Sequence, residues 1–161
     1  MAFLNENSPS EDTSQCITYA IAKLGEQRYE PAISALVRLL GFQRPPTDRE
    51  KRGYHIRMQA SYPAVEAIAQ LGKSTLPAIL EALRSDTGSP LARANAVFAW
   101  MEIYKYEKPA GIAALRQAVD RATDASSKQN LKWAVSKAMS WCSPIEETEC
   151  KEAAAKGREN R

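Results

Sequence analysis

The stretch LGKSTLPAIL, residues 71–80, contains the two signals that decide the fold. Leu71-Gly72 closes one amphipathic segment, and Pro77-Ala78-Ile79 opens the next one a few residues later. The same pairing occurs at Leu24-Gly25 with Pro31-Ala32-Ile33, at Ile103-Tyr104 with Pro109, and more faintly at Trp141-Cys142 with Pro144. The four prolines lie 46, 32 and 35 residues apart, a spacing typical of helical-hairpin repeats with one insertion.

Apolar residues recur at helical spacing within these segments, for example at Leu91, Ala94, Phe98 and Met101. No segment alternates apolar and polar residues for long enough to indicate a strand. We therefore predict an all-α fold, a short α-α superhelix of about four hairpins. The first helices are expected over 9–24, 63–71, 90–104 and 126–141, and the second helices over 30–40, 76–85, 109–122 and 144–156.

One domain over 9–156 is expected, with flexible tails at 1–8 and 157–161. Residues 41–62 interrupt the repeat spacing, and the capping box Thr47-Asp48-Arg49-Glu50 predicts a short helix inside this insertion. Gly25, Gly41 and Gly72 are expected to supply the left-handed residue past a helix end.

The last helix should hide the apolar face of the helix before it. Within 144–156, Ile145, Cys150 and Ala153 form the side that we expect to pack against 126–141.

Composition places the chain among ordinary globular proteins. It has 161 residues, 44% of them hydrophobic, and a net charge of +3, which alone does not argue for nucleic acid. No apolar run approaches the about 20 residues of a membrane helix, and the first residues lack the features of a signal peptide. Cys16, Cys142 and Cys150 have unrelated spacings, so neither a disulfide framework nor a zinc site is expected. We expect reduced thiols, a cytoplasmic location and no membrane partner.

The stretch SDTGSPLARANAVFAW, residues 85–100, is similar to a HEAT-like repeat. In that family an Asp in the inter-repeat turn precedes an Arg near the start of the next helix, followed by an alanine-rich stretch. Asp86 and Arg93 stand at those positions, and the Leu-Gly ends and Pro-Ala-Ile starts resemble the phycobilisome-lyase type of HEAT-like repeat. The resemblance covers about 9–142 and implies that Asp86 and Arg93 hydrogen-bond between turns and fix the angle between hairpins. Ala60-Ser61 falls where the second repeat would have its Arg, which implies an irregular stack there.

Basic residues recur in the second helices. Arg38, Arg84 and Arg116 each lie seven residues after an opening proline, and Lys151 lies at the same step after Pro144. This position lies beside the apolar stripe, so its side chain can pack while its cation reaches water. Second helices line the concave side in HEAT-like stacks, so the resemblance implies a basic ladder there. The alternative interpretation is that these cations only complement the negative ends of helix dipoles.

Two further groups are candidates for partner contact. Trp133 is preceded by Lys132 and followed by Lys137 at i+4, an arrangement suited to stacking on a base or a partner side chain. Tryptophan in a small helical fold is also commonly part of the core. The insertion contributes a basic loop with an aromatic residue, which is equally typical of a solvated surface. Its candidate residues are Arg49, Arg52, Tyr54 and Arg57.

Catalytic patterns are largely missing. His55 is the only histidine, and neither a Gly-rich phosphate loop nor a metal-ligand cluster is present. We predict a non-catalytic protein-protein interaction module or scaffold without cofactor or metal, which binds an acidic partner on the surface lined by the second helices. The alternative is binding of nucleic acid or a phosphate ligand on a basic groove, as in HEAT-like DNA glycosylases. A third interpretation is that the chain forms a homo-oligomer. If the chain is an enzyme, the resemblance implies glycosylase or lyase activity.

Overall fold

The computed structural model describes residues 11–53, 58–85, 88–143 and 146–155. Its helices are α1 (Glu11–Glu26), α2 (Ile33–Arg38), α3 (Asp48–Lys51), α4 (Met58–Ser61), α5 (Pro63–Leu71), α6 (Leu76–Arg84), α7 (Pro90–Ile103), α8 (Lys108–Arg121), α9 (Ala125–Met139) and α10 (Glu147–Ala155). The 3-10 helices Glu30–Ala32 and Gly72–Thr75 precede α2 and α6. These residues contain no strand, so the all-α prediction is confirmed. The expected tails 1–8 and 157–161 lie outside the described residues.

The helix starts follow the signals in the sequence. Pro63 and Pro90 are the first residues of α5 and α7, where the missing N–H of proline costs no helical hydrogen bond. Ser89 caps α7 by accepting a hydrogen bond from Ala92 N at 3.1 Å. Each expected first or second helix therefore has a counterpart, with ends that differ by a few residues.

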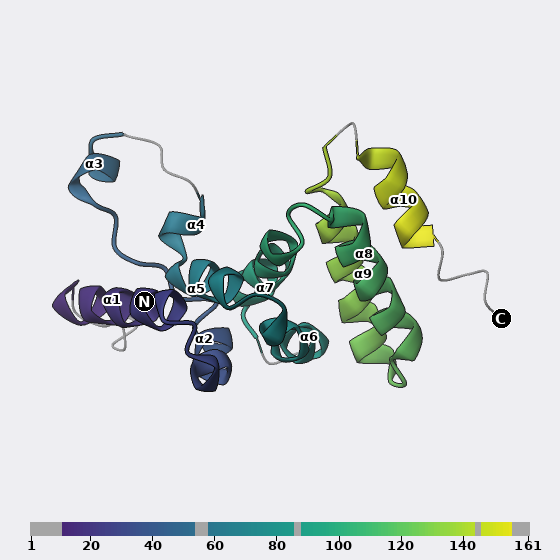
Figure 1. The fold of residues 1–161 in the computed structure, drawn as a ribbon, viewed down its shortest axis with the longest axis horizontal. Helices are drawn as coiled ribbons and strands as arrows, with labels where there is room; N and C mark the ends of the chain where they lie inside the picture. The colour runs from purple at the N-terminus through teal and green to yellow at the C-terminus, as the bar shows by residue number, and fades with distance from the viewer. Residues whose placement is uncertain (1–10, 54–57, 86–87, 144–145, 156–161) are drawn as a thin grey trace, which may run out of the picture.

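The first helices of the four expected hairpins, α1, α5, α7 and α9, pack against one another in chain order. Helices α2 and α6 lie along one side of this row, and α8 packs between α9 and α10 at the carboxyl end (Figure 1). The molecule is elongated along the row. Successive hairpins are thus neighbours in space.

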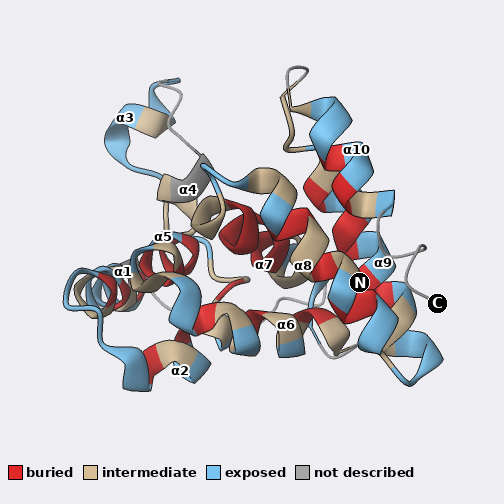
Figure 2. Cartoon of the chain, turned by 45° about the vertical axis from the view of Figure 1, so that its right-hand side comes forward, coloured by how far each residue is buried: buried red, intermediate tan, exposed pale blue. Residues whose placement is uncertain are grey.

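Buried residues lie where these helices meet (Figure 2), and small side chains among them allow the close contacts. Ala67 of α5, Ala99 of α7 and Ala134 of α9 are at most 1% exposed. A Cβ on Gly25 would lie 2.7 Å from Cα of Ala67, so α1 and α5 touch through this glycine. Only a residue without a side chain fits there.

The three glycines expected past helix ends behave differently. Gly72 has a φ of 74° directly after α5, as predicted. Gly25 lies inside α1, and Gly41 does not have a positive φ, so the prediction is wrong for both. The close approach of α5, rather than a turn, explains the glycine at position 25.

The insertion lies on the side of the row opposite to α2 and α6 (Figures 1 and 2). The expected capping box is present: Thr47 Oγ1 accepts from Glu50 N at 3.4 Å, and the Glu50 carboxylate accepts from Thr47 N at 2.7 Å. The Arg44 guanidinium lies 2.8 Å from Glu50 and also donates to the carbonyl oxygen of Ala60. Hydrogen bonds from Arg44 and Thr47 lower the pKa of Glu50 to about 2. Arg44, near the start of the insertion, therefore bonds both to α3 and to α4 near the end of the insertion.

Cys142 and Cys150 form a disulfide, so the expectation of reduced thiols is wrong for this pair. Their Cα atoms are 6.7 Å apart, and Cys150 is only 1% exposed. The chain reverses after α9 and brings residues separated by 8 positions together, which linear spacing does not reveal. Cys16 is free and exposed.

Helix α10 packs chiefly along α8 and less against α9. Its buried side contains Cys150 and Ala153 as expected, and Ile145 lies outside the described residues. Lys108 of α8 lies 2.8 Å from Glu146, just before α10. Trp141, just after α9, stacks on Phe98 of α7 with ring centroids 4.6 Å apart. The prediction that α10 packs mainly against 126–141 is therefore wrong, because its main contact is with α8.

Candidate partner-binding surface

Three second helices end in an arginine: Arg38 of α2, Arg84 of α6 and Arg121 of α8. After α6 and α8 the backbone is extended, with φ and ψ of −74° and 141° at Ser85 and −69° and 127° at Ala122. Each extended segment leads to the N-cap of a first helix, Ser89 of α7 or Asp124 of α9. The exits from α6 and α8 are thus built alike.

Asn95 of α7 contacts the end of α2. It is 4% exposed, and its Nδ2 donates to the carbonyl oxygen of Leu40 at 2.7 Å. This bond satisfies a carbonyl at a helix end that has no intrahelical partner. We call this contact between the end of α2 and α7 the first junction.

Asn130 of α9 makes the same kind of contact with the end of α6. It is 8% exposed, and its Nδ2 donates to the carbonyl oxygen of Arg84 at 3.0 Å. Its Oδ1 accepts from Arg93 Nη1 at 3.2 Å, and Arg93 Nη2 donates to the Ser85 carbonyl oxygen at 3.4 Å. We call this contact the second junction. Both asparagines lie six residues after an N-cap, so the two junctions occupy equivalent places.

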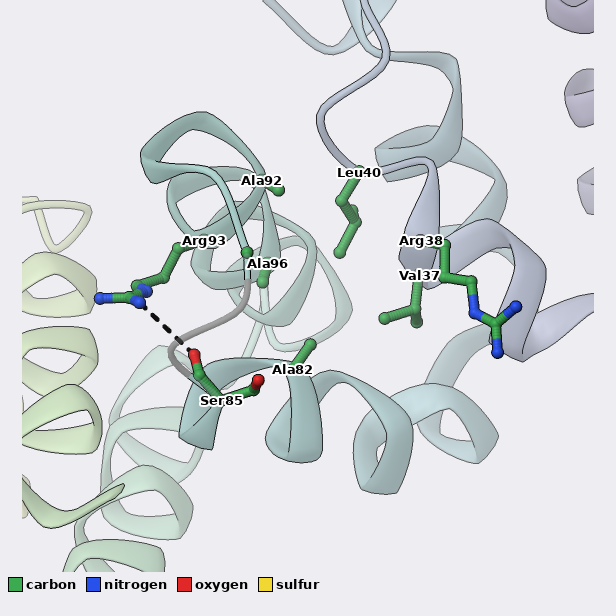
Figure 3. A pocket seen from close by; sticks show the side chains of 9 residues that line it. Val37, Arg38, Leu40, Ala82, Ser85, Ala92, Arg93 and Ala96 are labelled. Atoms are coloured by element: carbon green, nitrogen blue, oxygen red, sulfur yellow. Dashed lines mark hydrogen bonds between the residues drawn. The ribbon is translucent and has the colours of Figure 1, made fainter. Parts of the chain in front are cut away.

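A cavity of about 250 Å³ opens at the first junction between α2, α6 and α7 (Figure 3). Most of its side chains are apolar and several are alanines. Arg38 and Arg93 stand at opposite edges, and both guanidinium groups point away from the apolar side chains. The lining residues are Val37, Arg38, Leu40, Ala82, Ser85, Gly88, Ala92, Arg93 and Ala96.

A second cavity, of about 390 Å³, lies at the second junction. Its lining is polar and contains two arginines and two carboxylates. Arg84 lies 3.7 Å from Glu81, and the Asp124 carboxylate accepts from Ser127 N at 2.7 Å. The lining residues are Glu81, Arg84, Ser85, Arg121, Ala122, Thr123, Asp124 and Ser127.

The four cations at equal distance from the prolines do not border one cavity. Arg38 lines the first cavity and Arg84 the second, whereas Arg116 lines neither. Arg116 lies 3.7 Å from Asp120, and Lys151 lies 2.6 Å from Glu147, each on its own helix. Their role in partner binding stays a prediction.

Arg121 is a residue that the sequence analysis missed. Helix α8 has 14 residues and α6 has 9, so the same count from the proline stops at Arg116, well before the end of α8. Aligning α6 and α8 at their last residues instead pairs Arg84 with Arg121. The signal was present in the sequence at the other end of the helix.

The remaining candidates lie elsewhere. Trp133 is 38% exposed on α9 with Lys132 and Lys137 exposed beside it in sequence. Arg49 and Arg52 are exposed at α3, on the side of the row away from α2 and α6.

Three residues of interest cannot be placed. Tyr54, Arg57 and Asp86 lie outside the described residues. Arg93, for which the resemblance implies Asp86 as partner, connects α7 with the end of α6 and with α9.

The described residues contain no group of three His, Cys, Asp or Glu side chains that could hold a metal ion. None of their helices is long and apolar enough to cross a membrane. Comparison of the chain with protein-family models, curated proteins and solved structures finds no match. A function must therefore be inferred from the chain's own residues.

Proposed function

We propose that this chain is a HEAT-like repeat protein that binds a partner protein at the ends of its second helices and performs no chemistry itself. The observation that carries the proposal is the repetition of one surface element: each junction has a cavity next to the terminal arginine of a second helix. Repeated surfaces suit binding because a partner gains a contact at every step along the row.

The contacts of Arg93 support the HEAT-like assignment. The resemblance implies that this arginine fixes one hairpin on the next. In the structure it hydrogen-bonds to Asn130 of α9 and to the Ser85 carbonyl after α6. Its position between three helices agrees with that role.

The charges around the cavities favour an acidic protein over nucleic acid. The described lining residues include four arginines and two carboxylates, and the first cavity is mainly apolar. Nucleic-acid binding depends on many cations that displace counterions from phosphates. Here two of the six charged lining residues are carboxylates. A mixed surface with an apolar centre is typical of protein interfaces.

A parallel selection tests this function. Wild-type protein is presented with a random peptide library and with a random pool of single-stranded and duplex oligonucleotides. We expect peptides enriched in acidic and apolar residues, whose affinity falls at least about tenfold in Arg38→Glu/Arg84→Glu. The matched control Arg28→Glu/Lys105→Glu reverses two exposed positive charges that line neither cavity and should keep the affinity.

The selection can also contradict the proposal. Enrichment of oligonucleotides alone, with an affinity that falls linearly in log salt, would assign the surface to nucleic acid. Loss of peptide binding in both double variants would show that only net charge matters.

A further inference from the structure

We infer that the two cavities bind one extended segment of the partner, with an apolar side chain in the first cavity and a carboxylate three residues away in the second. The inference rests on the proposed function and names the kind of segment that this surface recognises. It follows from the lining, the charge and the spacing of the two cavities.

The first cavity has the lining and size for an aliphatic or small aromatic side chain. Val37, Leu40, Ala82, Ala92 and Ala96 supply its apolar walls, and the three alanines create the space. Its volume of about 250 Å³ exceeds the about 150 Å³ of an apolar cavity known to take up benzene. Burying a side chain of this kind removes apolar surface from water on both partners.

The second cavity has the donors for a carboxylate. Arg121 is exposed and has no ion pair among the described residues. Arg84 lies 3.7 Å from Glu81, longer than the about 2.7–2.9 Å of a charge-assisted hydrogen bond, so its donors can serve an incoming group. One carboxylate of the lining, Asp124, already caps α9. Arg84 and Arg121 are thus the cations of the lining that are available to the partner's acid.

Charge complementarity points to the same occupant. Over both cavities the described lining residues carry four arginines, Arg38, Arg84, Arg93 and Arg121, against two carboxylates. The excess of two positive charges comes from Arg38 and Arg93 at the edges of the first cavity, whereas the two arginines of the second cavity are balanced by Glu81 and Asp124. An acidic segment with one apolar anchor therefore matches the surface better than a neutral or basic one.

The spacing of the cavities sets the spacing of the motif. Ser85 lines both cavities, so they are adjacent. Packed neighbouring helices are about 8–10 Å apart, and an extended chain advances about 3.3 Å per residue. Three residues of an extended segment therefore span about 10 Å, the distance between neighbouring helices of the row. Three residues of a helical segment would rise only about 4.5 Å and would fall short.

Defined peptides test the inference. The probes are capped octapeptides of Ser and Gly that contain one Leu and one Glu. In two of them Leu and Glu are three positions apart, in either order, and in a third they are two positions apart. A fourth peptide has Ser in place of Leu, and a fifth has Gln in place of Glu. Binding is followed by NMR of the methyl groups of Val37, Ala82 and Ala92, and by titration. We expect one of the three-apart peptides to shift these methyl signals and to bind about tenfold tighter than the two-apart and Leu-free peptides.

Two variants locate the two contacts. Arg121→Gln should remove the preference for Glu over Gln in the peptide, while the methyl shifts remain. Ala82→Leu should fill the first cavity and remove the preference for Leu over Ser. Lys105→Gln, which changes an exposed cation that lines neither cavity, should leave both preferences intact. If Ala82→Leu does not fold, Arg121→Gln still decides the second half of the inference.

The outcomes separate this inference from the proposed function. Equal affinity of the three-apart and two-apart peptides, no binding by any probe, or shifts confined to the neighbourhood of Trp133 would each overturn the inference. Binding of library peptides at another surface would leave the proposed function standing. Failure of the whole peptide library would overturn both.

Discussion

The first and second junctions have the same framework but different linings. In both, an asparagine six residues after an N-cap donates to a carbonyl at the end of a second helix. Around Asn95 the cavity is lined by residues such as Ala92, whereas Ser127 stands at the matching place near Asn130. The comparison shows that buried asparagines fix the geometry while their neighbours set the chemistry. The hydrogen bonds that fix a junction and the residues that line its cavity can therefore change independently.

The largest effect is expected from a link outside both junctions. Replacing Cys142 and Cys150 by serine removes a cross-link between residues 8 positions apart, worth about 2.5 kcal/mol of unfolding free energy by the chain-entropy relation. Both junction hydrogen bonds should survive because α10 packs chiefly on α8. Urea denaturation measures the loss. The cost of Asn130→Ala should agree within about 0.5 kcal/mol in the two backgrounds. A larger difference would mean that the disulfide holds the second junction.

The two asparagines themselves come next. Asn95→Ala and Asn130→Ala each leave a carbonyl oxygen without its donor, at a cost of about 1–3 kcal/mol of unfolding free energy. Asn130→Ala should cost more, because Asn130 also accepts from Arg93. Urea denaturation of both variants gives the ranking. The reverse order would contradict the picture of a more connected second junction.

A double-mutant cycle isolates that extra connection. Arg93→Ala combined with Asn130→Ala should show a coupling of about 0.5–1.5 kcal/mol, since the two side chains share a hydrogen bond at 3.2 Å. Arg93→Ala combined with Asn95→Ala is the matched control and should be additive within about 0.5 kcal/mol. Equal coupling in both cycles would mean that the junctions act as one unit.

Acid should have the smallest effect on the junctions, because amide and guanidinium groups do not titrate below neutral pH. The carboxylates with lowered pKa lie elsewhere. The ammonium group of Lys108, together with Ser143, lowers the pKa of Glu146 from 4.5 to about 2, and Glu50 has a similarly low pKa. Their contribution to stability is present above pH 4.5 and is lost as the pH falls toward 2.

The urea midpoint should therefore fall between pH 4.5 and pH 2.5 in the wild type and fall less in Glu50→Gln/Glu146→Gln. The difference between the costs of Asn95→Ala and Asn130→Ala should be the same at both pH values. An unchanged acid response in the glutamine variant would assign it to other carboxylates.

Local signals in the sequence predicted the helices well. Proline at a first helical position, serine before it and the Thr47 capping box each act over one turn of chain, so their effect can be read from neighbouring residues. The all-α class followed from these signals and from helical periodicity.

Features that depend on packing were missed. Gly25 is explained by the approach of α5, and the disulfide by the reversal of the chain after α9. Arg121 was not predicted because α8 is longer than α6, so that counting seven residues from the proline stops before the end of α8. Asn95 and Asn130 could have been found by aligning the first helices on their N-caps, but their carbonyl partners lie 55 and 46 residues away.

These distances in sequence affect how the chain unfolds. In an ideal repeat protein each unit touches only the next, so stability is a sum of unit and nearest-neighbour terms and the ends can fray one unit at a time. Here α2 of the first hairpin bonds to α7 of the third, and α6 of the second bonds to α9 of the fourth. Each junction skips one hairpin, which adds a second-neighbour term to that sum. Loss of either inner hairpin therefore breaks a bond to a hairpin two steps away, which couples the unfolding of hairpins that are not adjacent in the chain.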